Sequence, residues 1–548
     1  MPTSSLDALI VGAGPVGLTM AAALNHQGLR CRLIEKTPAA SDKSKALVMW
    51  ARSLELLNGL NLADTFVAAG HKIRGGSVYA DGERVVHLDL TGNESPFGFP
   101  LMIPQNETER LLTAHLAQHG IPVERNVELT TFRESAAAVT CTLRHADGRE
   151  EAIDVPWLLG CDGAHSTVRH TLGLDFTGAA EPNDWLLADV HIAGPIAADE
   201  ISAFWCEKGV LVIFPMGNNR FRVVADTGAA TNAPAKAEVT LADAQAKVDE
   251  RGPVGLKLFD PIWLANFRIN ERKVANYRRG RIMLAGDAAH IHSPAGGQGM
   301  NTGMQDAFNL AWKLALIQRG LGQAEPLLES YSIERSAVGD QVLENASRFT
   351  TVATLRNPVA QWIRNHVAPI VSSFHFVQDK MRQDMWEMSI NYRHSPLSEN
   401  KWPALTGGLA AGDRMCDAPL TSPDGRLTTL FAETAGNGHT LLFLPATDAA
   451  NDDPDAIPQL LLIAADVDHK HPGVASPHLI LKQGAAHASL ASHTPAWFDA
   501  EGQLYEQLHA TSPTLILIRP DGYIAFRSQP ADGDALLAFM STYLIPNH

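Results

Sequence analysis

The chain has 548 residues, of which 45% are hydrophobic and 19% are charged, so it is long enough for several domains and unlike a disordered segment. Its 44 basic and 60 acidic residues give a formal net charge of −16, which argues against binding to nucleic acid or to anionic lipid. No stretch approaches the roughly 18 consecutive apolar residues of a membrane span, and a strand-like run starting at Leu6 leaves no room for a signal peptide, so neither a membrane anchor nor secretion is predicted.

The N-terminal segment predicts a β-α-β unit. An apolar strand ends at Val11, a helix is expected over 16–27, and a second strand is expected over 30–34. This order of elements requires a parallel sheet. Between the first strand and the helix stands a GxGxxG motif, formed by Gly12, Ala13, Gly14, Pro15, Val16 and Gly17.

The glycines of this motif suit a dinucleotide. Gly12 permits a tight turn, Gly14 lets a pyrophosphate approach the backbone, and Gly17 lets the helix pack close to the sheet. Glu35, at the end of the second strand, can accept hydrogen bonds from ribose hydroxyls, and its charge disfavours a 2′-phosphate. The unit therefore suits FAD or NAD, with a Gly-rich turn of an unrelated α/β protein as the alternative.

Two stretches, at about 75–90 and 186–224, show the alternating pattern of half-buried strands. Turn signals interrupt them at Asp81-Gly82 and at 217–219. We expect antiparallel strands that form a second layer.

A second polar motif follows the apolar strand 157–160. Asp162 stands at the strand end, and Ser166 or Thr167 can cap the helix that comes next. Such a corner suits a cofactor, although Asp162 by itself is explained equally well as a turn former.

The third motif is the strongest. A buried strand over 281–285 delivers Asp287 at its carboxyl end, and a Gly-rich loop leads to a helix expected from about Asn301. Backbone N–H groups at such a helix start stabilise negative charge, as on a reduced flavin. Helical spacing then continues to about Tyr392.

Beyond Ser395, prolines and glycines interrupt the periodicity and indicate a linker. Residues 404–548 then predict a small α/β module. Its strand-like runs are 439–444, 459–464, 478–481 and 515–518. The chain's five cysteines lack CxxC spacing, which predicts free thiols in a reducing cytoplasm, no metal site and no disulfide exchange in this module. Its expected role is packing or oligomerisation, a homodimer included.

In order and spacing, the three motifs resemble those of the class A, single-component FAD-dependent aromatic hydroxylases related to p-hydroxybenzoate, phenol and 3-(3-hydroxyphenyl)propionate hydroxylases. The sequences 412–414 and 517–523 look like the appended thioredoxin-like domain of the longer members. The resemblance implies an α/β fold. A Rossmann-like FAD-binding domain of the glutathione-reductase type would comprise 1–74, 100–185 and 280–395, an antiparallel-sheet substrate domain would comprise 75–99 and 186–279, and a thioredoxin-like domain would comprise 404–548.

Carried over by position, the resemblance implies a set of residues that hold FAD. They are Gly12, Gly14, Pro15, Val16, Gly17, Glu35, Lys36, Lys45, Gln105, Val127, Asp162, Asp287, Pro294, Gly299, Met300 and Asn301. One departure stands at Lys45, where relatives usually carry Arg. Lysine keeps the charge but loses the bidentate fork, so a pyrophosphate or a moving flavin is expected to be held less firmly.

The implied activity is hydroxylation of a small phenolic substrate with O₂, by way of a flavin C4a-hydroperoxide. NADH or NADPH would bind transiently and reduce the FAD, because the single dinucleotide motif is taken by FAD. The alternatives are an epoxidase, a Baeyer-Villiger oxygenase or a tailoring oxygenase on a larger polycyclic substrate. A flavin-binding protein without catalytic activity is the alternative from another class.

The flavin carries this chemistry, so no side chain has a forced catalytic role. Arg222 and Trp205, on predicted strands of the second layer, and His292, beside the third motif, are candidates for contact with the substrate. Each also has a plainer interpretation, as an exposed strand arginine, a core tryptophan and a structural loop histidine. His290 shares the ambiguity of His292.

Overall fold

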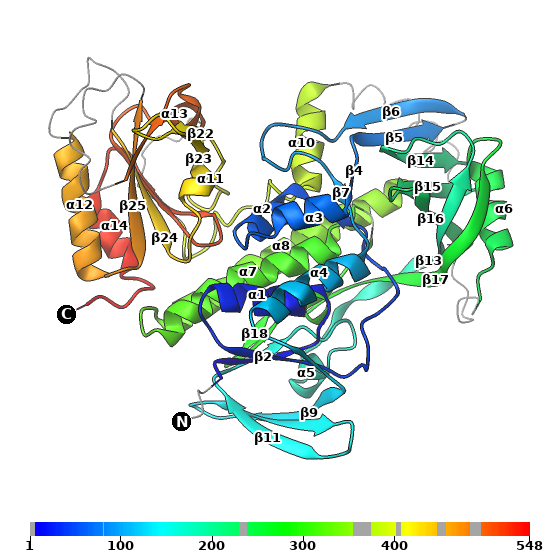
Figure 1. Ribbon diagram of the computed structural model, residues 1–548, viewed down its shortest axis with the longest axis horizontal. Coiled ribbons are helices and arrows are strands. Elements are labelled where there is room, and N and C mark those ends of the chain that lie inside the picture. The colour runs from blue at the N-terminus through cyan, green and yellow to red at the C-terminus, as the bar shows by residue number, and fades with distance from the viewer. Residues whose placement is uncertain are drawn as a thin grey trace.

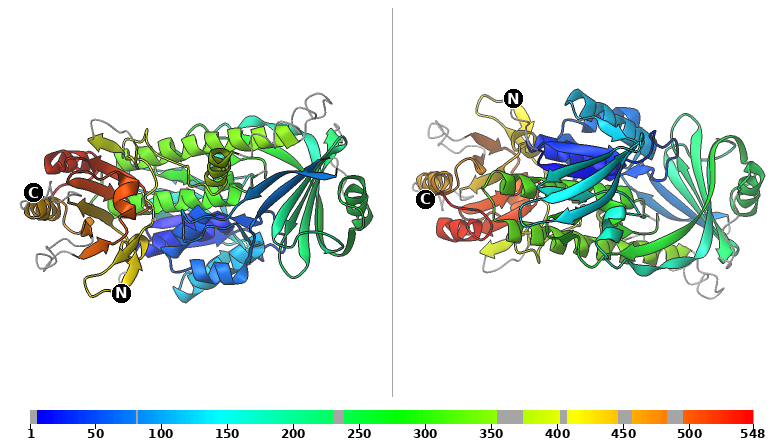
Figure 2. Two further views of the ribbon diagram at one scale, coloured as in Figure 1. Left: turned by 90° about the horizontal axis from the view of Figure 1, so that it is seen from above. Right: turned by 90° about the horizontal axis from the view of Figure 1, so that it is seen from below.

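The computed structural model describes residues 6–80, 82–229, 238–294, 296–353, 374–401, 407–445, 456–482 and 495–547. A central region lies between an eight-stranded outer sheet at one end and a C-terminal α/β region at the other (Figures 1 and 2). Within these ranges, no helix has both the length and the apolar character needed to cross a bilayer.

A six-stranded sheet forms the core of the central region. In spatial order its strands are β18 (Arg278–Arg279), β19 (Ile282–Leu284), β12 (Trp157–Gly160), β1 (Ala8–Val11), β2 (Cys31–Glu35) and β8 (Val123–Arg125). Neighbouring strands are parallel except for β18 and β19, so the predicted parallel order is confirmed. Leu9, Ile10 and Leu33 on these strands are fully buried.

The central region also contains helices. They are α1 (Pro15–His26), α2 (Ala51–Asn58), α3 (Ala63–Ala69), α4 (Gln105–Gln118), α5 (Thr167–Thr171), α7 (Gly299–Gln318), α8 (Ala324–Ala353) and α10 (His375–Met385), with a 3₁₀ turn, η1 (Gly286–Ala288). The helical stretch predicted from Asn301 to Tyr392 is interrupted after α7, where Gly320 has a left-handed backbone with φ of 71°. Its part at 354–373 lies outside the described residues.

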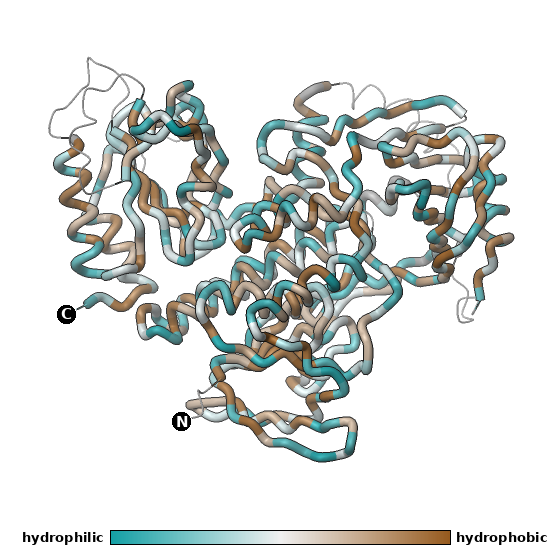
Figure 3. Tube along the Cα trace, viewed as in Figure 1, coloured by the Kyte–Doolittle hydropathy of each residue, from teal (hydrophilic) through white to brown (hydrophobic). Residues whose placement is uncertain are grey.

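Two small sheets flank the central region. One contains β9 (Val127–Glu134), β10 (Val139–His145) and β11 (Glu150–Val155), and the other contains β3 (Val48–Met49), β7 (Leu101–Met102) and β4 (His71–Lys72). Along β10 buried residues alternate with more exposed ones, and the trace of this sheet is a mixture of hydrophobic and hydrophilic positions (Figure 3). One face of a strand is therefore buried and the other meets solvent, as expected of a sheet that covers a core from outside.

The outer sheet has eight strands. In spatial order they are β20 (His290–Ile291), β17 (Lys257–Lys273), β13 (Thr177–Ala193), β16 (Arg220–Ala229), β15 (Gly209–Pro215), β14 (Glu200–Cys206), β5 (Gly75–Ala80) and β6 (Glu83–Asp89). The antiparallel expectation is wrong at one pair, because β14 and β5 are parallel. These two strands are separated by the segment 81–199, so no hairpin sets their direction. The predicted turn at 217–219 is confirmed by left-handed backbone at all three residues, whereas Asp81 lies outside the described residues.

The two faces of the outer sheet differ. Phe221 and Val223 belong to a buried cluster with Ala244 and Val248 of α6 (Leu241–Arg251), which covers the side away from the central region (Figure 1). Because side chains alternate along a strand, Arg222 lies on the opposite face. That face is turned toward the central region.

The C-terminal region has its own eight-stranded sheet. In spatial order its strands are β21 (Glu399–Lys401), β28 (Ile524–Ser528), β27 (Thr514–Ile518), β24 (His439–Leu444), β25 (Ala475–Lys482), β26 (Ala496–Asp499), β22 (Pro419–Thr421) and β23 (Leu427–Thr429). Its helices are α11 (Leu430–Glu433), α12 (Ala456–Lys470), α13 (Gln503–Leu508) and α14 (Gly533–Met540). The predicted strands at 439–444, 478–481 and 515–518 are confirmed.

The strand predicted at 459–464 is wrong, because this run lies within helix α12. Ile457, Leu460 and Val467 are buried at helical spacing, while Leu462 is 65% exposed. A short apolar run does not distinguish a buried strand from the buried stripe of a helix.

A buried network of charges joins the C-terminal region to the central region. Arg519, after β27, donates to Glu334 of α8 at 2.7 and 2.9 Å. Lys313 of α7 donates to the same carboxylate at 2.8 Å, and all three side chains are fully buried. Burial alone would raise the pKa of Glu334, but Arg519 and Lys313 hold it well below its usual range. The carboxylate therefore stays charged and paired.

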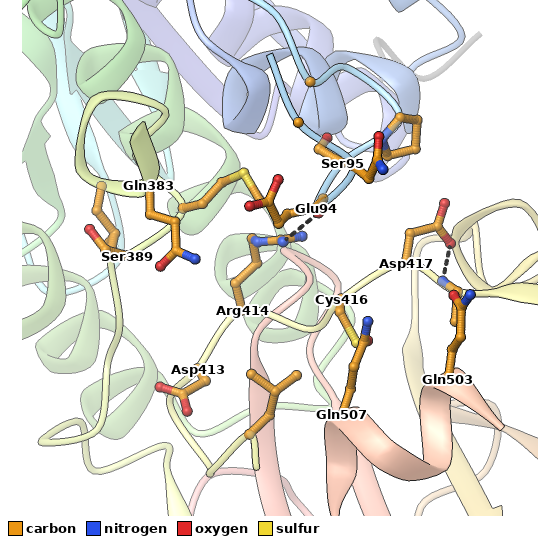
Figure 4. Close-up of a pocket in the computed structure, with 18 of the residues that line it drawn as sticks. Glu94, Ser95, Gln383, Ser389, Asp413, Arg414, Cys416, Asp417, Gln503 and Gln507 are labelled. Carbon is orange, nitrogen blue, oxygen red and sulfur yellow. Dashed lines mark hydrogen bonds between the residues drawn. The ribbon is translucent and has the colours of Figure 1, made fainter. Parts of the chain in front are cut away.

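A cavity of about 920 Å³ lies at the same junction (Figure 4). Arg414, which lines it, donates to the backbone oxygen of Glu94 at 3.2 Å and to the carboxylate of Glu55 at 3.1 Å. Cys416 also lines it, and burial raises the pKa of its thiol to about 12. That thiol is protonated at neutral pH and a poor nucleophile.

Candidate functional site

Three loops leave the six-stranded sheet at one edge. In the register of the sheet, Val11 of β1 lies opposite Gly160 of β12, and Gly160 lies opposite Leu284 of β19. The carboxyl ends of these parallel strands therefore coincide. The loops that follow carry Gly14, Asp162 and Asp287, and the place outside the carboxyl ends of a parallel sheet is where such folds bind their ligands. We call it the FAD edge.

The first loop packs closely against each of the other two. A Cβ atom on Gly12 would stand 2.8 Å from the Cα atom of Asp162, and one on Gly286 would stand 2.6 Å from Cγ2 of Val16. Both positions accept only glycine, and both have left-handed backbone, with φ of 101° at Gly12 and 58° at Gly286. The sequence motifs thus converge in space, as predicted.

The glycines of the first motif have different surroundings. A Cβ on Gly17 would stand 1.9 Å from the carbonyl oxygen of Gly12, so this glycine lets α1 pack against the turn. At Gly14, in contrast, no atom lies within 4 Å of the corresponding position. Helix α1 begins directly afterwards with Pro15, and no side chain caps it. An open approach to a helix N-terminus fits a phosphate group.

Glu35 is oriented toward the same turn. Its carboxylate accepts hydrogen bonds from the backbone N–H groups of Ala13 and Thr37, both at 2.9 Å. A carboxylate has further lone pairs, which fits acceptance from a ribose hydroxyl. The neighbouring Lys36 is exposed.

Asp162 has one oxygen bonded and one free. Its Oδ2 accepts from the N–H of Val168 at 3.1 Å, and Ser166 rather than Thr167 caps helix α5 by accepting from Arg169 at 2.9 Å. Its Oδ1 is buried and has no hydrogen-bond partner within the described part of the chain. Buried polar atoms are almost always paired, so this oxygen fits a ligand that donates to it.

Asp287 lies in the 3₁₀ turn η1, shortly after β19. Its side chain is exposed, although Gly286 and Ala288 on either side are buried. Burial by the surrounding protein raises the pKa of its carboxyl, while the charges of His290 and Lys45 act in the opposite direction. An accessible carboxylate enclosed in this way fits binding to hydroxyl groups, such as those of a ribityl chain.

Gln105 holds the segment 44–46. Its backbone N–H donates to Oγ of Ser44 at 2.8 Å, and its side-chain oxygen accepts from the N–H of Ala46 at 3.1 Å. Lys45, between these two residues, is exposed. Val127 is buried at the start of β9.

The loop before α7 borders the FAD edge as well. The helix begins at Gly299, slightly earlier than predicted, and Pro294 in the loop is exposed whereas Met300 is buried. Asn301 uses its side chain internally, donating to the carbonyls of Val48 and Gly297, both at 2.9 Å. Only the backbone of this residue is left to meet a cofactor.

A polar stripe along α7 was not predicted from the sequence. Thr302, Gln305, Asp306, Asn309 and Lys313 are all buried at helical spacing. Asp306 accepts from the N–H of Gly286 at 2.9 Å, from His290 at 3.0 Å and from Arg335 at 2.6 Å. Burial would raise the pKa of Asp306, but Arg335 and His290 lower it. This carboxylate therefore fixes the loop that carries Asp287, and the run of polar residues at three- and four-residue spacing was its signal in the sequence.

His292 is neutral in the folded protein. Its Nδ1 lies 2.9 Å from the carbonyl of Ser293, and burial lowers its pKa to about 4. Its Nε2 is buried without a partner within the described ranges. A Cβ on Gly299 would stand 3.3 Å from this ring, so His292 packs against the start of α7.

The two strand candidates behave differently. Trp205 is half-buried and packs with Trp185, Val210 and Ile269 on the face of the outer sheet that is turned toward the central region. Arg222, expected to reach the substrate or to be exposed, is only 3% exposed and is hydrogen-bonded to protein atoms. The interpretation as an exposed strand arginine is wrong, because the central region covers it.

The family model described as "FAD binding domain" matches residues 5–346. Over 98% of this chain and 94% of the other, the sequence is 34% identical to 6-methylpretetramide 4-monooxygenase of Streptomyces rimosus. It is also 31% identical to pentachlorophenol 4-monooxygenase of Sphingobium chlorophenolicum, over 99% of this chain and 98% of that one. The chain therefore belongs to the FAD-dependent monooxygenase family of class A aromatic hydroxylases.

Solved structures agree with this assignment. An anhydrotetracycline hydroxylase from Streptomyces rimosus superposes with a TM-score of 0.75, at 27% identity and with 99% of each chain covered. A flavin-dependent monooxygenase in complex with FAD and substrate shows the same fold, with a TM-score of 0.79 at 19% identity, over 99% of this chain and 100% of that one. The protein is thus an FAD-dependent monooxygenase of mixed α/β fold.

Proposed function

We propose that the protein hydroxylates an electron-rich, phenolic ring held between the FAD edge and the outer sheet, using O₂ and either NADH or NADPH. One observation carries this proposal: Arg222 of the outer sheet donates hydrogen bonds to the backbone of segment 44–46. The face of the sheet that carries Arg222 is therefore directed toward the FAD edge. When bound, FAD accepts hydride from the nicotinamide and activates O₂.

In this proposal each part of the FAD edge has one binding task. The N–H groups at the start of α1 and the open side of Gly14 receive the pyrophosphate, Glu35 receives the adenosine ribose, and Asp287 receives the ribityl hydroxyls. The first N–H groups of α7 stabilise negative charge on the flavin ring. The unpaired oxygen of Asp162 is left to accept a hydrogen bond from a hydroxyl group of the bound cofactor.

The substrate side of the site is apolar. Trp205, Val212, Val224 and Phe267 are half-buried around a buried group that includes Trp185. These side chains provide ring surfaces for stacking and exclude water from the reacting atoms. Neutral His292 keeps the start of α7 in place rather than supplying a charge.

The size of the substrate is open to experiment. One relative is named for pentachlorophenol and another for 6-methylpretetramide, so both a small phenol and a larger tailoring substrate belong in the test. An epoxidase or Baeyer-Villiger activity on a larger substrate would use the same cofactor site. A flavin-binding protein without catalysis is the third alternative.

The test is an oxidation screen. Purified protein carrying FAD is given NADH or NADPH with pentachlorophenol, with 6-methylpretetramide or with anhydrotetracycline, under ¹⁸O₂. We expect one compound to accelerate NAD(P)H oxidation and to gain one ¹⁸O atom, as measured by mass spectrometry. Hydrogen peroxide as the sole product with every compound would contradict hydroxylation of these classes, and an inserted ring oxygen or an epoxide would identify an alternative.

We also propose that residues 404–548 form a thioredoxin-like domain without redox activity. In support, β24 and β25 are parallel, β27 is antiparallel to both β24 and β28, and the thiol of Cys416 has a raised pKa. The division at 1–74, 100–185 and 280–395 against 75–99 and 186–279, a cytoplasmic location and a homodimer remain part of the same proposal. Sedimentation of the full chain would test the homodimer.

A further inference from the structure

Arg222 links two regions of the molecule that lie far apart in sequence. It stands on β16 of the outer sheet, and its side chain is buried. Its Nη1 donates to the carbonyl of Lys45 at 2.7 Å, and its Nη2 donates to the carbonyl of Ser44 at 2.5 Å. A strand of the outer sheet thus holds the backbone of a loop at the FAD edge.

Asp189 fixes the orientation of this arginine. It lies opposite Arg222 in the pairing of β13 with β16, and it is fully buried. Its two carboxylate oxygens accept from Nε and Nη2 of Arg222 at 2.7 and 2.9 Å. Such a two-point pair sets the plane of the guanidinium, so its remaining donors have one direction, toward segment 44–46. Four hydrogen bonds occupy this guanidinium, which assigns it to protein rather than to substrate.

The other side of segment 44–46 is fixed by the FAD-binding region itself. Gln105 bonds to both Ser44 and Ala46, as described above. The segment has no regular secondary structure, and its contacts on this side are the bonds to Gln105, among them one from the backbone N–H of Gln105 to the carbonyl of Ala46 at 3.1 Å. It is held between Gln105 on one side and Arg222 on the other.

This segment carries Lys45, and Lys45 acts on the FAD edge. Its side chain is exposed, and the chain continues from it to Val48, whose carbonyl accepts from the side chain of Asn301 at the start of α7 at 2.9 Å. The place of the Lys45 ammonium group relative to the start of α7 therefore depends on where Arg222 holds the backbone.

We propose that Arg222, oriented by Asp189, is a positioning residue that couples the outer sheet to Lys45 and so to the bound flavin. Val224, two residues along β16, belongs to the apolar face on which we place the substrate. A ligand that shifts β16 would thus change the position of Lys45 without touching the flavin. Arginine is required because a lysine, with a single ammonium group, cannot pair with Asp189 and bond to two carbonyls in fixed directions.

The central test variant is the double substitution Asp189→Asn/Arg222→Gln. It removes both charges together, so no unpaired charge is left buried, and the shorter glutamine cannot reach both carbonyls. The matched control is Arg220→Gln. Arg220 lies on the same strand and pairs with the same Asp189 at 3.4 Å, but it is the weaker partner and is 28% exposed. Arg222→Lys is the intermediate variant.

Two measurements report on the position of the segment. Hydrogen–deuterium exchange of a peptide covering 40–50 is followed in the FAD-free protein, and FAD binding is followed by flavin fluorescence together with the visible spectrum of the bound flavin. In the double variant we expect about tenfold faster exchange in this peptide, about tenfold weaker FAD binding and a shifted flavin spectrum. Arg222→Lys should lie between the double variant and the wild type, and Arg220→Gln should match the wild type.

Equal exchange and equal flavin spectra in the double variant and in Arg220→Gln would overturn the proposal. Weaker FAD binding with unchanged exchange would overturn it too, because the segment would then not be the link. Circular dichroism checks that each variant folds, and if the double variant does not, faster exchange in Arg222→Lys carries the test. Only the expected effect of a ligand on β16 rests on the proposed function. Neither measurement uses a substrate, so both results would stand even if the protein hydroxylated none of the compounds tested.

Discussion

The FAD edge and the junction with the C-terminal region both contain carboxylates that are important for the fold or the site. The two regions differ in how many hydrogen-bond partners the protein gives to these carboxylates. At the junction, Glu334 is bonded to Arg519, Lys313 and Asn309, and each of these side chains is buried. At the FAD edge, Asp162 keeps a buried oxygen without a partner in the described structure, and Asp287 stays exposed. Buried charge therefore marks a scaffold where it is fully paired and a binding site where it is not.

The largest effect that would test this comparison is expected at the junction. Arg519→Ala leaves Glu334 and Asp521 without their shared partner in a dry environment, so we expect a loss of about 3–5 kcal/mol in the free energy of unfolding, measured in urea. Arg426→Ala is the control, because Arg426 is 58% exposed and its pair with Glu433 should contribute less than about 1 kcal/mol. A loss of that small size for Arg519→Ala would mean that the junction is not a scaffold.

The next effect separates two glycines of one motif. Gly14→Ala places a methyl group in open space, so the FAD-free protein should keep its stability while FAD binding weakens by about 100-fold. Gly17→Ala drives a methyl group into the carbonyl of Gly12 and should destabilise the FAD-free protein by about 1–3 kcal/mol. Urea unfolding and fluorescence titration with FAD measure the two quantities. If both variants behaved alike, Gly14 would be a packing residue.

The smallest effect concerns pH. Burial lowers the pKa of His292 to about 4, below its ordinary value of 6.5, so the unfolded chain takes up a proton before the folded one. This contribution to stability is complete above the ordinary pKa and is lost as the pH falls toward 4. Between pH 7 and pH 5 the wild type should therefore lose about 2 kcal/mol more than His292→Gln, measured by urea unfolding. Equal losses would show that the pKa of His292 is not lowered in the folded protein.

The convergence of the three loops at one edge of the sheet could be predicted because each motif is local in sequence. The spacing of Gly12, Gly14 and Gly17 alone predicts their turn, and the apolar pattern predicts the strand that precedes Asp287. The turn at 217–219 was predictable for the same reason, since glycine and asparagine tolerate left-handed backbone.

Features that depend on distant partners could not be predicted. Nothing near Arg222 in sequence indicates that it bonds to residues 44 and 45, and nothing near Arg519 indicates Glu334. The helix at 456–470 was mistaken for a strand because the apolar run at 459–464 fits either period, and only the packing of Leu460 and Val467 against the C-terminal core decides between them.

Helix α7 extends for 20 residues, about 30 Å, from the FAD edge to the C-terminal region. Trp312 and Leu316, in its last turns, share one hydrophobic cluster with Leu441 and Phe443 of β24. A protein shortened to end near residue 400 would expose these apolar side chains to water and would tend to aggregate. An ancestral chain that acquired this C-terminal region could therefore not easily discard it again, even if the region never carried out a reaction of its own.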